Sequence, residues 1–386
     1  MYKYDSRKIN SGDIFIVLPN GEKHIADAIK NGATSYLKMN RIELAEFSRE
    51  YYQNPSQKLK VIGVTGTNGK TTVTHLVNQA LNTMGYKSTV LGTINASLTT
   101  PESLDIQALM AEHLASGGTH FVMEVSSHGI AQQRIHGIDF AIKALTNITQ
   151  DHLDFHKTFE NYKNTKLNFM KDGNGLKIYP EDYKKLKITF PTLLLGDFNQ
   201  DNLKTTMAIL QQLGFSDQDV KISLKNAYAP IGRFEKIDKG QPFLVIIDYA
   251  HTPDGLENVC KTAKDICEKQ QGKLLLLFGC GGDRDRGKRP QMAAIASKYA
   301  DFFIVTDDNP RTEDPKQIFS DILSGLDPAA NNYLAIHNRK IAIKALIKKA
   351  KEDDIVLITG KGHETYQVFK HKTIHFDDHE EVQKCL

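Results

Sequence analysis

A glycine-rich segment is the first part of the chain whose residues could do chemistry. Gly66-Thr-Asn-Gly-Lys-Thr-Thr72 follows an apolar run over residues 59–65 and precedes a helical pattern. In such a strand–loop–helix unit, glycines let backbone N–H groups approach phosphate oxygens, and the helix N-terminus adds partial positive charge. Lys70 is expected to contact the β- and γ-phosphates of a nucleotide, and Thr71 to hold Mg²⁺ through its hydroxyl group.

The loop departs from the general GxxxxGK[ST] pattern, which would place glycine where Val64 stands; Gly63 lies one residue earlier. A tight strand-to-helix turn that binds nothing is the alternative interpretation. The flanking sequence favours phosphate binding, because the helical pattern has one apolar face and ends at Gly85, which fits a C-cap. The apolar face consists of Val73, Leu76, Val77, Ala80 and Leu81.

Two further polar residues lie at or beyond the ends of apolar runs. Glu124 stands near the end of the run 119–125, and His152 lies just beyond the run 141–148. Taken alone, such a glutamate is more often a solvated charge, and such a histidine a polar surface residue. A mononucleotide site of the phosphate-loop type, however, needs an acid at the end of a neighbouring strand to bind metal. We therefore expect Glu124 to be a metal ligand, and His152 lies where parallel-sheet proteins bind ligands.

The elements that position these residues are short apolar runs, each followed by a turn and a helical pattern. Near-continuous apolar character is typical of strands buried on both faces, as in parallel sheets. Alternation with helices indicates an α/β fold. The runs cover residues 59–65, 119–125, 141–148, 243–248, 274–278, 302–306 and 355–359.

A polar, proline-containing join at residues 51–60 and a second proline-containing join at residues 227–231 divide the chain. A length of 386 residues is also too great for one ordinary domain. We expect a small N-terminal domain over residues 1–58 and a central phosphate-loop domain with a parallel sheet over residues 59–230. A C-terminal, Rossmann-like α/β domain is expected over residues 231–386.

Composition and charge restrict the class of protein. The chain is 40% hydrophobic and 25% charged, and its formal charge of +3 gives no argument for a nucleic-acid partner. No apolar run approaches the roughly 18 residues of a membrane span, and the N-terminus lacks the apolar centre of a signal peptide, so a cytoplasmic protein is expected. Cys260, Cys267, Cys280 and Cys385 form no CxxC pair; we expect reduced packing residues rather than zinc ligands or disulfides.

Together with the phosphate loop, six further segments form a series along almost the whole chain. They are Glu124-Val-Ser-Ser-His-Gly129, Thr146-Asn-Ile-Thr-Gln-Asp-His-Leu-Asp154, Asp248-Tyr-Ala-His-Thr-Pro-Asp254, Gly279-Cys-Gly-Gly-Asp-Arg-Asp-Arg-Gly-Lys-Arg289, Asp308-Asn-Pro-Arg311 and Gly360-Lys-Gly-His-Glu364. The series resembles that of the Mur ligase family, to which the folylpolyglutamate synthetases are related. The resemblance implies an ATP-dependent ligase that joins an amino acid to a carboxylate through an acyl-phosphate, in peptidoglycan precursor synthesis.

Residue by residue, the resemblance assigns an ATP site with two Mg²⁺ ions. The residues implied to bind ATP are Gly66, Thr67, Asn68, Gly69, Lys70, Thr71 and Thr72, with Arg233, Asp248 and His251 from the C-terminal domain. Thr71 and Glu124 would bind one Mg²⁺, and His152 a second. Lys166 matches the lysine that the family carbamylates with CO₂ to N6-carboxylysine, which turns a cation into an anion beside the metal. From the sequence alone, an ordinary lysine on a helix surface is the alternative.

The resemblance also implies the other two substrates, both small molecules, and a monomeric enzyme is expected. Positions that match the site for a UDP-N-acetylmuramoyl dipeptide are Ser6, Thr99, Thr100, Ser126, Gln132 and Arg134. Positions that match the amino-acid pocket are Arg284, Asp308, Asn309, Arg311, Gly360 and Glu364. Within this resemblance Arg311 predicts meso-diaminopimelate, because the distal carboxylate of that amino acid needs a cationic, preferably bidentate partner.

Two departures from the family and three alternatives stay open. The N-terminal UDP-binding domain is trimmed, with only 65 residues before Gly66, and the stretch 171–195 is short as well. A sister ligase that adds L-lysine or another amino acid, or an enzyme like folylpolyglutamate synthetase, is the enzymatic alternative. The non-enzymatic alternative is a nucleotide-binding switch or scaffold, which would bind ATP without releasing phosphate in response to an amino acid.

Overall fold

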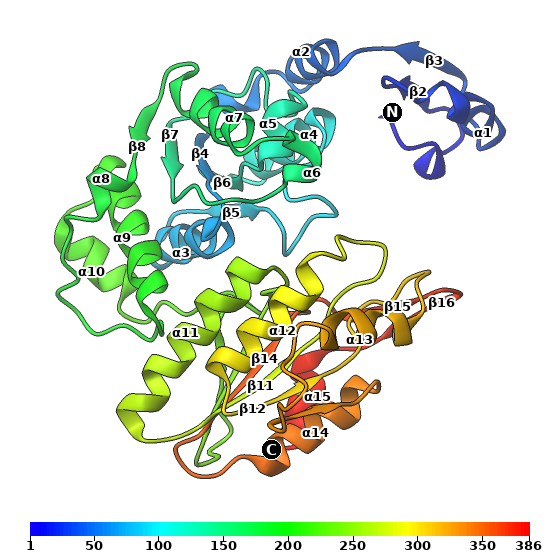
Figure 1. Ribbon diagram of the computed structural model, residues 1–386. Helices are drawn as coiled ribbons and strands as arrows, with labels where there is room; N and C mark the ends of the chain where they lie inside the picture. Colours follow the sequence, from blue (N-terminus) through cyan, green and yellow to red (C-terminus); the bar gives the residue numbers. More distant parts are fainter. The chain divides into compact units, whose positions relative to one another are not determined.

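The computed structural model describes the backbone of residues 1–386 and every side chain except that of Asp154. The chain divides into two compact units (Figure 1). Unit 1 comprises Met1–Phe190 and Asp201–Lys225, and unit 2 comprises Pro191–Gln200 and Asn226–Leu386. The three domains expected over residues 1–58, 59–230 and 231–386 remain a prediction.

The N-terminal part of unit 1 contains a parallel sheet in the order β1-β2-β3. Its elements are β1 (Tyr2–Lys3), η1 (Ser6–Lys8), β2 (Ile14–Val17), η2 (Glu22–His24), α1 (Ile25–Lys30), β3 (Ser35–Lys38), α2 (Arg41–Tyr51) and η3 (Pro55–Gln57). A small core around Phe15 and Val17 lies between β2 and α1, and Ile16 packs with Leu44 on the other face. Helix α2 begins at a capping box in which Asn40 and Glu43 satisfy each other's backbone N–H groups.

The central sheet of unit 1 is entirely parallel, in the order β5-β6-β4-β7-β8. Its strands are β4 (Lys60–Thr65), β5 (Ser88–Leu91), β6 (His120–Glu124), β7 (Ile142–Leu145) and β8 (Leu176–Ile178). The helices of this part are α3 (Lys70–Thr83), α4 (Ser103–Ala115), α5 (Ser127–Ala131), α6 (Leu153–His156), α7 (Phe159–Lys171), α8 (Pro180–Tyr183), α9 (Asp197–Gln212) and α10 (Asp217–Leu224). The first residues of α9, up to Gln200, belong to unit 2. Every residue of β6 and β7 is buried, as their continuous apolar character predicted.

Helix α3 confirms the pattern that favoured a phosphate loop. All five residues of its predicted apolar face are buried, and Gly85 follows the helix with φ +85°. Its first residue is Lys70, so the glycine-rich segment leads from β4 directly into the N-terminus of a helix.

Unit 2 is built on a sheet in the order β13-β12-β11-β14-β10-β9, parallel except for β9 at one edge. Its strands are β9 (Glu235–Ile237), β10 (Leu244–Asp248), β11 (Leu274–Phe278), β12 (Phe302–Val305), β13 (Tyr333–Ala335) and β14 (Ile355–Thr359). Its helices are α11 (Pro253–Gln270), α12 (Lys288–Tyr299), α13 (Pro315–Leu323), α14 (Arg339–Lys349) and α15 (Asp378–Gln383), and β15 (Tyr366–Phe369) pairs with β16 (Lys372–His375) in a separate hairpin.

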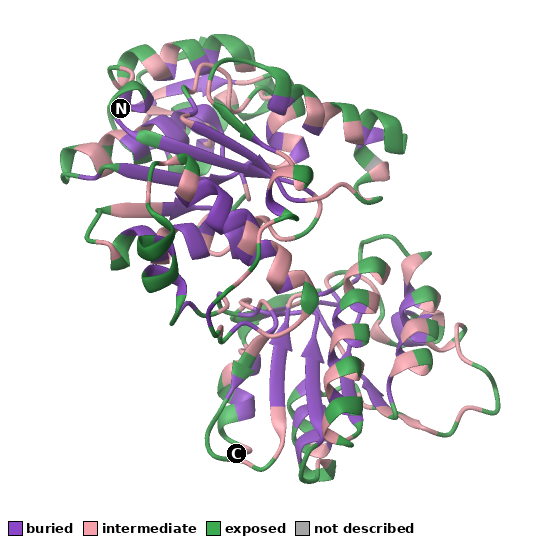
Figure 2. Cartoon of the chain, turned by 90° about the vertical axis from the view of Figure 1, so that its left-hand side faces the viewer, coloured by how far each residue is buried: buried purple, intermediate pink, exposed green. Residues whose placement is uncertain are grey.

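Both faces of this sheet carry a hydrophobic core, so the strands are buried while the covering helices expose their outer sides (Figure 2). Helices α11, α12 and α13 supply one core and α14 the other. All seven predicted runs form strands, which confirms the α/β fold class.

Cys260, Cys267 and Cys280 pack in the first core, and all four cysteines are unpaired. The helices of the described chain include none that is long and apolar enough to cross a membrane.

Candidate active site

The phosphate loop of unit 1 needs glycine at two positions. Gly66 has φ +149°, and a Cβ atom there would lie 1.8 Å from Oγ1 of Thr146 at the end of β7. Gly69 has φ +88°, and a Cβ atom would lie 2.3 Å from Oδ1 of Asn202 on α9. Val64 lies inside β4, paired with both neighbouring strands, so the close approach that requires glycine falls at Gly66 instead.

The end of β7 holds the loop in place. Asn147 accepts from the N–H of Thr67 through its carbonyl oxygen (2.9 Å) and from the N–H of Asn68 through Oδ1 (3.0 Å). Nζ of Lys70 donates to the carbonyl oxygens of Gly66 and Thr67 at 2.9 and 2.8 Å, which places its charge over the loop. The predicted ATP residues 66–72 thus form one structure, with Asn147 as a support that the sequence had not singled out.

Glu124 lies at the end of β6, directly behind this loop, and is 1% exposed. Its Oε2 accepts from the hydroxyl of Thr71 at 3.0 Å, and Oε1 accepts from the N–H of Thr93 at 2.8 Å. A Cβ atom on Gly92 would lie only 2.2 Å from Oε1, so this position has no room for a side chain. A hydroxyl and a carboxylate are the hard oxygen donors that Mg²⁺ prefers. The two residues expected to bind Mg²⁺ are thus in contact, with Gly92 and Thr93 beside them, and the metal itself stays a prediction.

Lys166 is not a surface lysine. It is 1% exposed on α7, its Nζ donates to the carbonyl oxygen of Gly66 at 2.8 Å, and it lies 4.7 Å from the centre of the Tyr162 ring. Burial, together with the nearby positive charge of Lys70, lowers the pKa of Lys166 well below its ordinary value. Tyr162 in turn hydrogen-bonds Oγ1 of Thr67 at 2.8 Å, so α7 and the phosphate loop are joined by side chains.

His152 stands at the N-terminus of α6 with φ +53°, and its side chain is 46% exposed. Its ring centre lies 4.8 Å from that of His128 and 6.3 Å from that of Tyr162, and Nε2 is 3.4 Å from Oδ2 of Asp151. The described side chains contain no group of three or more His, Cys, Asp or Glu that could hold a metal ion. A second Mg²⁺ at His152 therefore stays a prediction.

Four of the six residues predicted to hold the muramoyl dipeptide are directly connected. Thr100 is buried; its hydroxyl donates to the carbonyl oxygen of Glu124 and accepts from the N–H of Ser126, both at 2.9 Å. Arg134 donates to the carbonyl oxygen of Thr100 at 2.8 Å and to Oε1 of Gln132. These residues gather where β6 ends, beside Glu124.

The remaining two residues differ in position. Thr99 reaches the same region through a hydroxyl contact of 3.0 Å with Thr93, which also bonds Glu124. Ser6 is buried in η1, where its carbonyl oxygen accepts from Asn31, and none of the other predicted substrate residues is among its hydrogen-bond partners in the described structure.

One buried carboxylate in this region was not predicted from the sequence. Glu102 is 5% exposed and lies between two arginines, with 3.2 Å from Oε1 to Nε of Arg134 and 3.2 Å to NH2 of Arg41 on α2. Buried charges need partners, and this one orients the guanidinium of a predicted substrate residue. The sequence around Glu102 (TTPE, residues 99–102) gives no signal for this role. The role becomes visible only from the arginines that lie next to Glu102 in the fold.

In unit 2, the predicted nucleotide residues gather where β10 ends. Asp248 is buried and accepts from the N–H groups of Phe234 and Ala250 at 2.7 Å each. Burial raises its pKa to about 6, although the positive charge of Arg233 opposes this. The Arg233 guanidinium lies 4.8 Å from the centre of the Tyr249 ring. His251 is exposed on the same loop, and its Nδ1 is 2.9 Å from the Tyr249 carbonyl oxygen.

The predicted amino-acid residues of unit 2 form a second group, after β12 and β14. Asn309 is buried; its amide donates to Oε2 of Glu364 at 2.8 Å, and Nζ of the fully buried Lys361 lies 3.1 Å from the same Glu364 oxygen. Gly360 has φ +110°, and a Cβ atom there would lie 2.8 Å from Oδ2 of Asp308. Lys361, to which the sequence assigns no role, forms an ion pair with Glu364.

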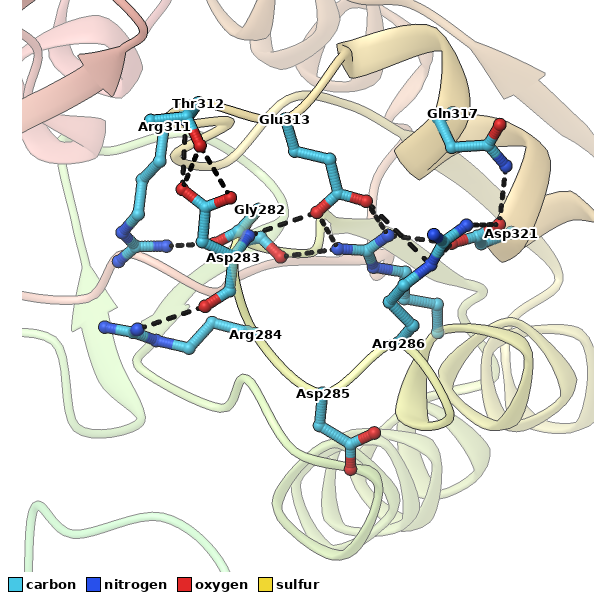
Figure 3. A network of polar contacts seen from close by, with 12 residues as sticks. Gly282, Asp283, Arg284, Asp285, Arg286, Arg311, Thr312, Glu313, Gln317 and Asp321 are labelled. Atoms are coloured by element: carbon cyan, nitrogen blue, oxygen red, sulfur yellow. Dashed lines mark hydrogen bonds and ion pairs between the residues drawn. The ribbon is translucent and has the colours of Figure 1, made fainter. Parts of the chain in front are cut away.

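Arg284 and Arg311 lie on two loops that follow neighbouring strands β11 and β12 (Figure 3). NH1 of Arg311 donates to the carbonyl oxygen of Gly282 at 2.9 Å, so Arg311 is anchored on one edge of its guanidinium. Arg284 is exposed, and its NH1 donates to the carbonyl oxygen of Asp283 at 3.2 Å. Both guanidinium groups lie on the same side of the loop pair in Figure 3.

Comparison with known proteins assigns these two sites to one class. The Mur ligase middle domain family matches residues 64–193, and the Mur ligase glutamate ligase domain family matches residues 232–362. A protein of Clostridioides difficile (strain 630) is 38% identical over 459 aligned positions, which cover 100% of this chain and 94% of the relative. It is named UDP-N-acetylmuramoyl-L-alanyl-D-glutamate--2,6-diaminopimelate ligase, as is a protein of Bacillus cereus (strain ATCC 14579) that is 36% identical, with 99% and 93% coverage.

Comparison with solved structures gives the same family. A structure of a UDP-N-acetylmuramoyl-L-alanyl-D-glutamate--2,6-diaminopimelate ligase matches with a TM-score of 0.64 and 30% identity, covering 100% of this chain and 94% of that one. MurF ligase of Thermotoga maritima in complex with ADP has the same fold, with a TM-score of 0.65 at 15% identity and 100% and 96% coverage. The chain belongs to the Mur ligase family and is an ATP-dependent amino-acid ligase. The relative from Clostridioides difficile carries additional segments, because its alignment with this chain spans 459 positions and this chain has 386 residues.

Proposed function

We propose that the protein adds meso-diaminopimelate to UDP-N-acetylmuramoyl-L-alanyl-D-glutamate with cleavage of ATP to ADP and phosphate. The names of relatives at 36–38% identity over the whole chain support this substrate pair. The structural observation that carries the choice of amino acid is Arg311, which is anchored beside Arg284 in unit 2.

The first chemical step concerns unit 1. A carboxylate of the muramoyl dipeptide attacks the γ-phosphorus of ATP, which gives an acyl-phosphate and ADP. Lys70 would stabilise the charge on the phosphate oxygens, while backbone N–H groups at the start of α3 hold the phosphates. Arg134, oriented by Glu102, would bind the anionic substrate near the end of β6.

A Mg²⁺ ion fits the oxygen pair of Thr71 and Glu124, because Mg²⁺ is commonly held by one or two carboxylates and the phosphates of its substrate. The ion would neutralise phosphate charge in the first step. The role of the protein is to keep the two oxygen ligands 3.0 Å apart behind the loop, and Thr93 fixes the second carboxylate oxygen.

The surroundings of Lys166 support a carbamate. CO₂ reacts with the neutral amine, and the lowered pKa of Lys166 favours that form. In the reaction the amine nitrogen forms a bond to the carbon of CO₂, and one proton is released to solvent. The product is an anion on α7 next to the phosphate loop, a position that suits a cation bound with the nucleotide.

The second step transfers the acyl group to the incoming amino acid, whose amine displaces phosphate. The choice of that amino acid concerns unit 2. Diaminopimelate differs from lysine by a carboxylate at its far end, and a guanidinium can bind a carboxylate through two parallel hydrogen bonds. If lysine occupied the site, the Arg311 guanidinium would lack a carboxylate partner, a penalty of about 1–3 kcal/mol.

ATP and UDP-linked precursors are metabolites of the cytoplasm, so we place the enzyme there. We take a single chain as the working unit.

The test of the proposed function is product formation: the purified protein is incubated with ATP, Mg²⁺, UDP-N-acetylmuramoyl-L-alanyl-D-glutamate and one amino acid at a time. Phosphate release together with a product heavier by one diaminopimelate residue is the expected result. ATP binding without amino-acid-dependent phosphate release would instead indicate a nucleotide-binding switch.

A further inference from the structure

Two loops of unit 2, over residues 279–287 and 306–314, are joined by a set of charged side chains that the proposed mechanism has not used (Figure 3). The first loop follows β11 and carries Arg284; the second follows β12 and carries Arg311. Their backbones touch directly: the N–H of Gly282 donates to the carbonyl oxygen of Asn309 at 2.9 Å. A Cβ atom on Gly282 would lie 1.9 Å from the carbonyl oxygen of Pro310.

Asp283 makes the first connection between the side chains of the two loops. Its carboxylate accepts from the N–H of Thr312 at 3.0 Å and from the Thr312 hydroxyl at 2.9 Å. Asp283 has φ +55°, and Arg311, which precedes Thr312, has φ +56°. Few residues other than glycine adopt this left-handed conformation, and Asp and Asn are among those that tolerate it. Asp283 therefore suits both the bend of its own loop and the bond to the other.

Glu313 makes the reciprocal connection. Its Oε2 accepts from the N–H of Asp283 at 3.1 Å, and its two carboxylate oxygens each accept from Arg289 at 2.7 Å. Arg289 is fully buried and is also paired with Asp321 on α13 at 2.7 Å. A buried guanidinium must keep its partners, because an uncompensated buried charge is strongly unfavourable. The second loop is thus attached to α12 and α13 as well as to the first loop.

We propose that Asp283 is a positioning residue for amino-acid selectivity, which acts by holding the loop of Arg311 and the loop of Arg284 in one fixed arrangement. The inference rests on the proposed function. Asp283 itself does not touch the amino acid; it acts through Thr312, the neighbour of Arg311, and through its own neighbour Arg284. Two pre-positioned cations lose little conformational freedom when they bind a carboxylate, which favours the amino acid that carries one.

The test compares three variants by steady-state kinetics. Asp283→Ala removes both bonds to Thr312 and places alanine in a left-handed conformation, and we expect a roughly tenfold rise in KM for diaminopimelate. The KM values for ATP and for the UDP-dipeptide should stay at their native values, and the preference for diaminopimelate over lysine should fall. Asp283→Asn keeps an acceptor and the tolerance for this backbone conformation, so it should restore most of the native KM.

Asp285→Ala is the matched control, because Asp285 lies on the same loop and its carboxylate accepts from the N–H of Gly287 at 2.8 Å rather than from the second loop. Its kinetics should equal those of the native enzyme. If Asp283→Ala does not fold, as judged by thermal unfolding, Thr312→Val removes one donor of the same contact. That variant should raise the same KM by about threefold.

An unchanged KM for diaminopimelate with unchanged selectivity in a folded Asp283→Ala would overturn the inference. So would an equal rise in the KM values of all three substrates, since that indicates a general structural role. These outcomes differ from failure of the proposed function, in which the native enzyme itself does not use diaminopimelate. In that case the same comparison is made with the amino acid that the enzyme does use, and the KM criterion decides for or against Asp283.

Discussion

Lys70 and Lys166 donate to the same carbonyl oxygen, that of Gly66, at 2.9 and 2.8 Å. Two ammonium groups on one acceptor disfavour each other, and Lys166 is the more deeply buried of the pair. Burial and the positive charge of Lys70 both lower the pKa of Lys166, so we assign Lys166 to the neutral, CO₂-reactive role and Lys70 to the phosphate. This relationship underlies the roles proposed for both.

Replacing Lys70 with alanine should lower kcat by at least about 10²-fold, because it removes the cation that faces the developing charge on the phosphate.

Glu124→Ala should instead raise the concentration of Mg²⁺ needed for half-maximal activity, since Thr71 would be left as the only ligand of the pair. Initial rates measured over a Mg²⁺ titration separate the two effects. Near-native turnover of either variant at ordinary Mg²⁺ would show that its assignment is wrong.

Lys166→Ala should be nearly inactive, and a small added carboxylate such as formate should restore part of the activity by replacing the carbamate. Lys166→Arg, which keeps the positive charge but does not react with CO₂, should not be restored. The assay is phosphate release with and without the carboxylate. Carbamates are lost in acid, so density beyond Nζ in a nucleotide-bound crystal is the direct check, and an unmodified Lys166 there contradicts the proposal.

Glu102→Gln should raise the KM for the UDP-dipeptide by about tenfold while the KM for diaminopimelate stays native. The reason is that the amide cannot pair as an anion with Arg41 and Arg134, so Arg134 loses a fixed position near the substrate carboxylate. Arg41→Ala provides a second measurement, because Arg41 pairs with the same carboxylate. A native KM in both variants would show that Arg134 does not depend on Glu102.

Asp248 predicts a pH dependence of stability. Burial raises its pKa from 3.8 to about 6, so the folded state favours the neutral carboxyl group. Its stabilising contribution is complete below pH 3.8 and is lost as the pH rises through 6, by at most about 3 kcal/mol. The unfolding free energy of the native protein, measured relative to Asp248→Asn by denaturant titration, should therefore fall between pH 4 and 6.5. Parallel pH profiles for the two proteins would contradict this.

Much of the fold could be predicted because strands that are buried on both faces have continuous apolar sequences. Strand β5, at the edge of the central sheet, was missed, since its four residues begin with Ser88 and Thr89. Strand β9 was missed as well, because it is a short antiparallel edge with the charged residues Glu235 and Lys236.

The candidate site could be predicted as far as its residues lie next to strand ends or within the motifs of the family. Glu124 was found from its place at the end of β6, but its contact with Thr93 joins segments that are distant in sequence. The burial of Lys166 was invisible for the same reason, because a lysine on an amphipathic helix is ordinarily exposed. Glu102 lies outside these motifs, and the motif that contains Lys361 gave it no role. Only the fold shows that each is buried against a predicted substrate residue.

The most direct measurement of the central claim is kcat/KM for meso-diaminopimelate and for L-lysine, on the native enzyme and on Arg311→Ala. The account predicts a preference of at least about tenfold for diaminopimelate in the native enzyme, because lysine leaves the guanidinium of Arg311 without its carboxylate partner. In Arg311→Ala that preference should largely disappear, while the KM for ATP stays native. Equal or better kcat/KM for lysine in the native enzyme would contradict the account, and a variant that keeps the preference would show that Arg311 does not carry it.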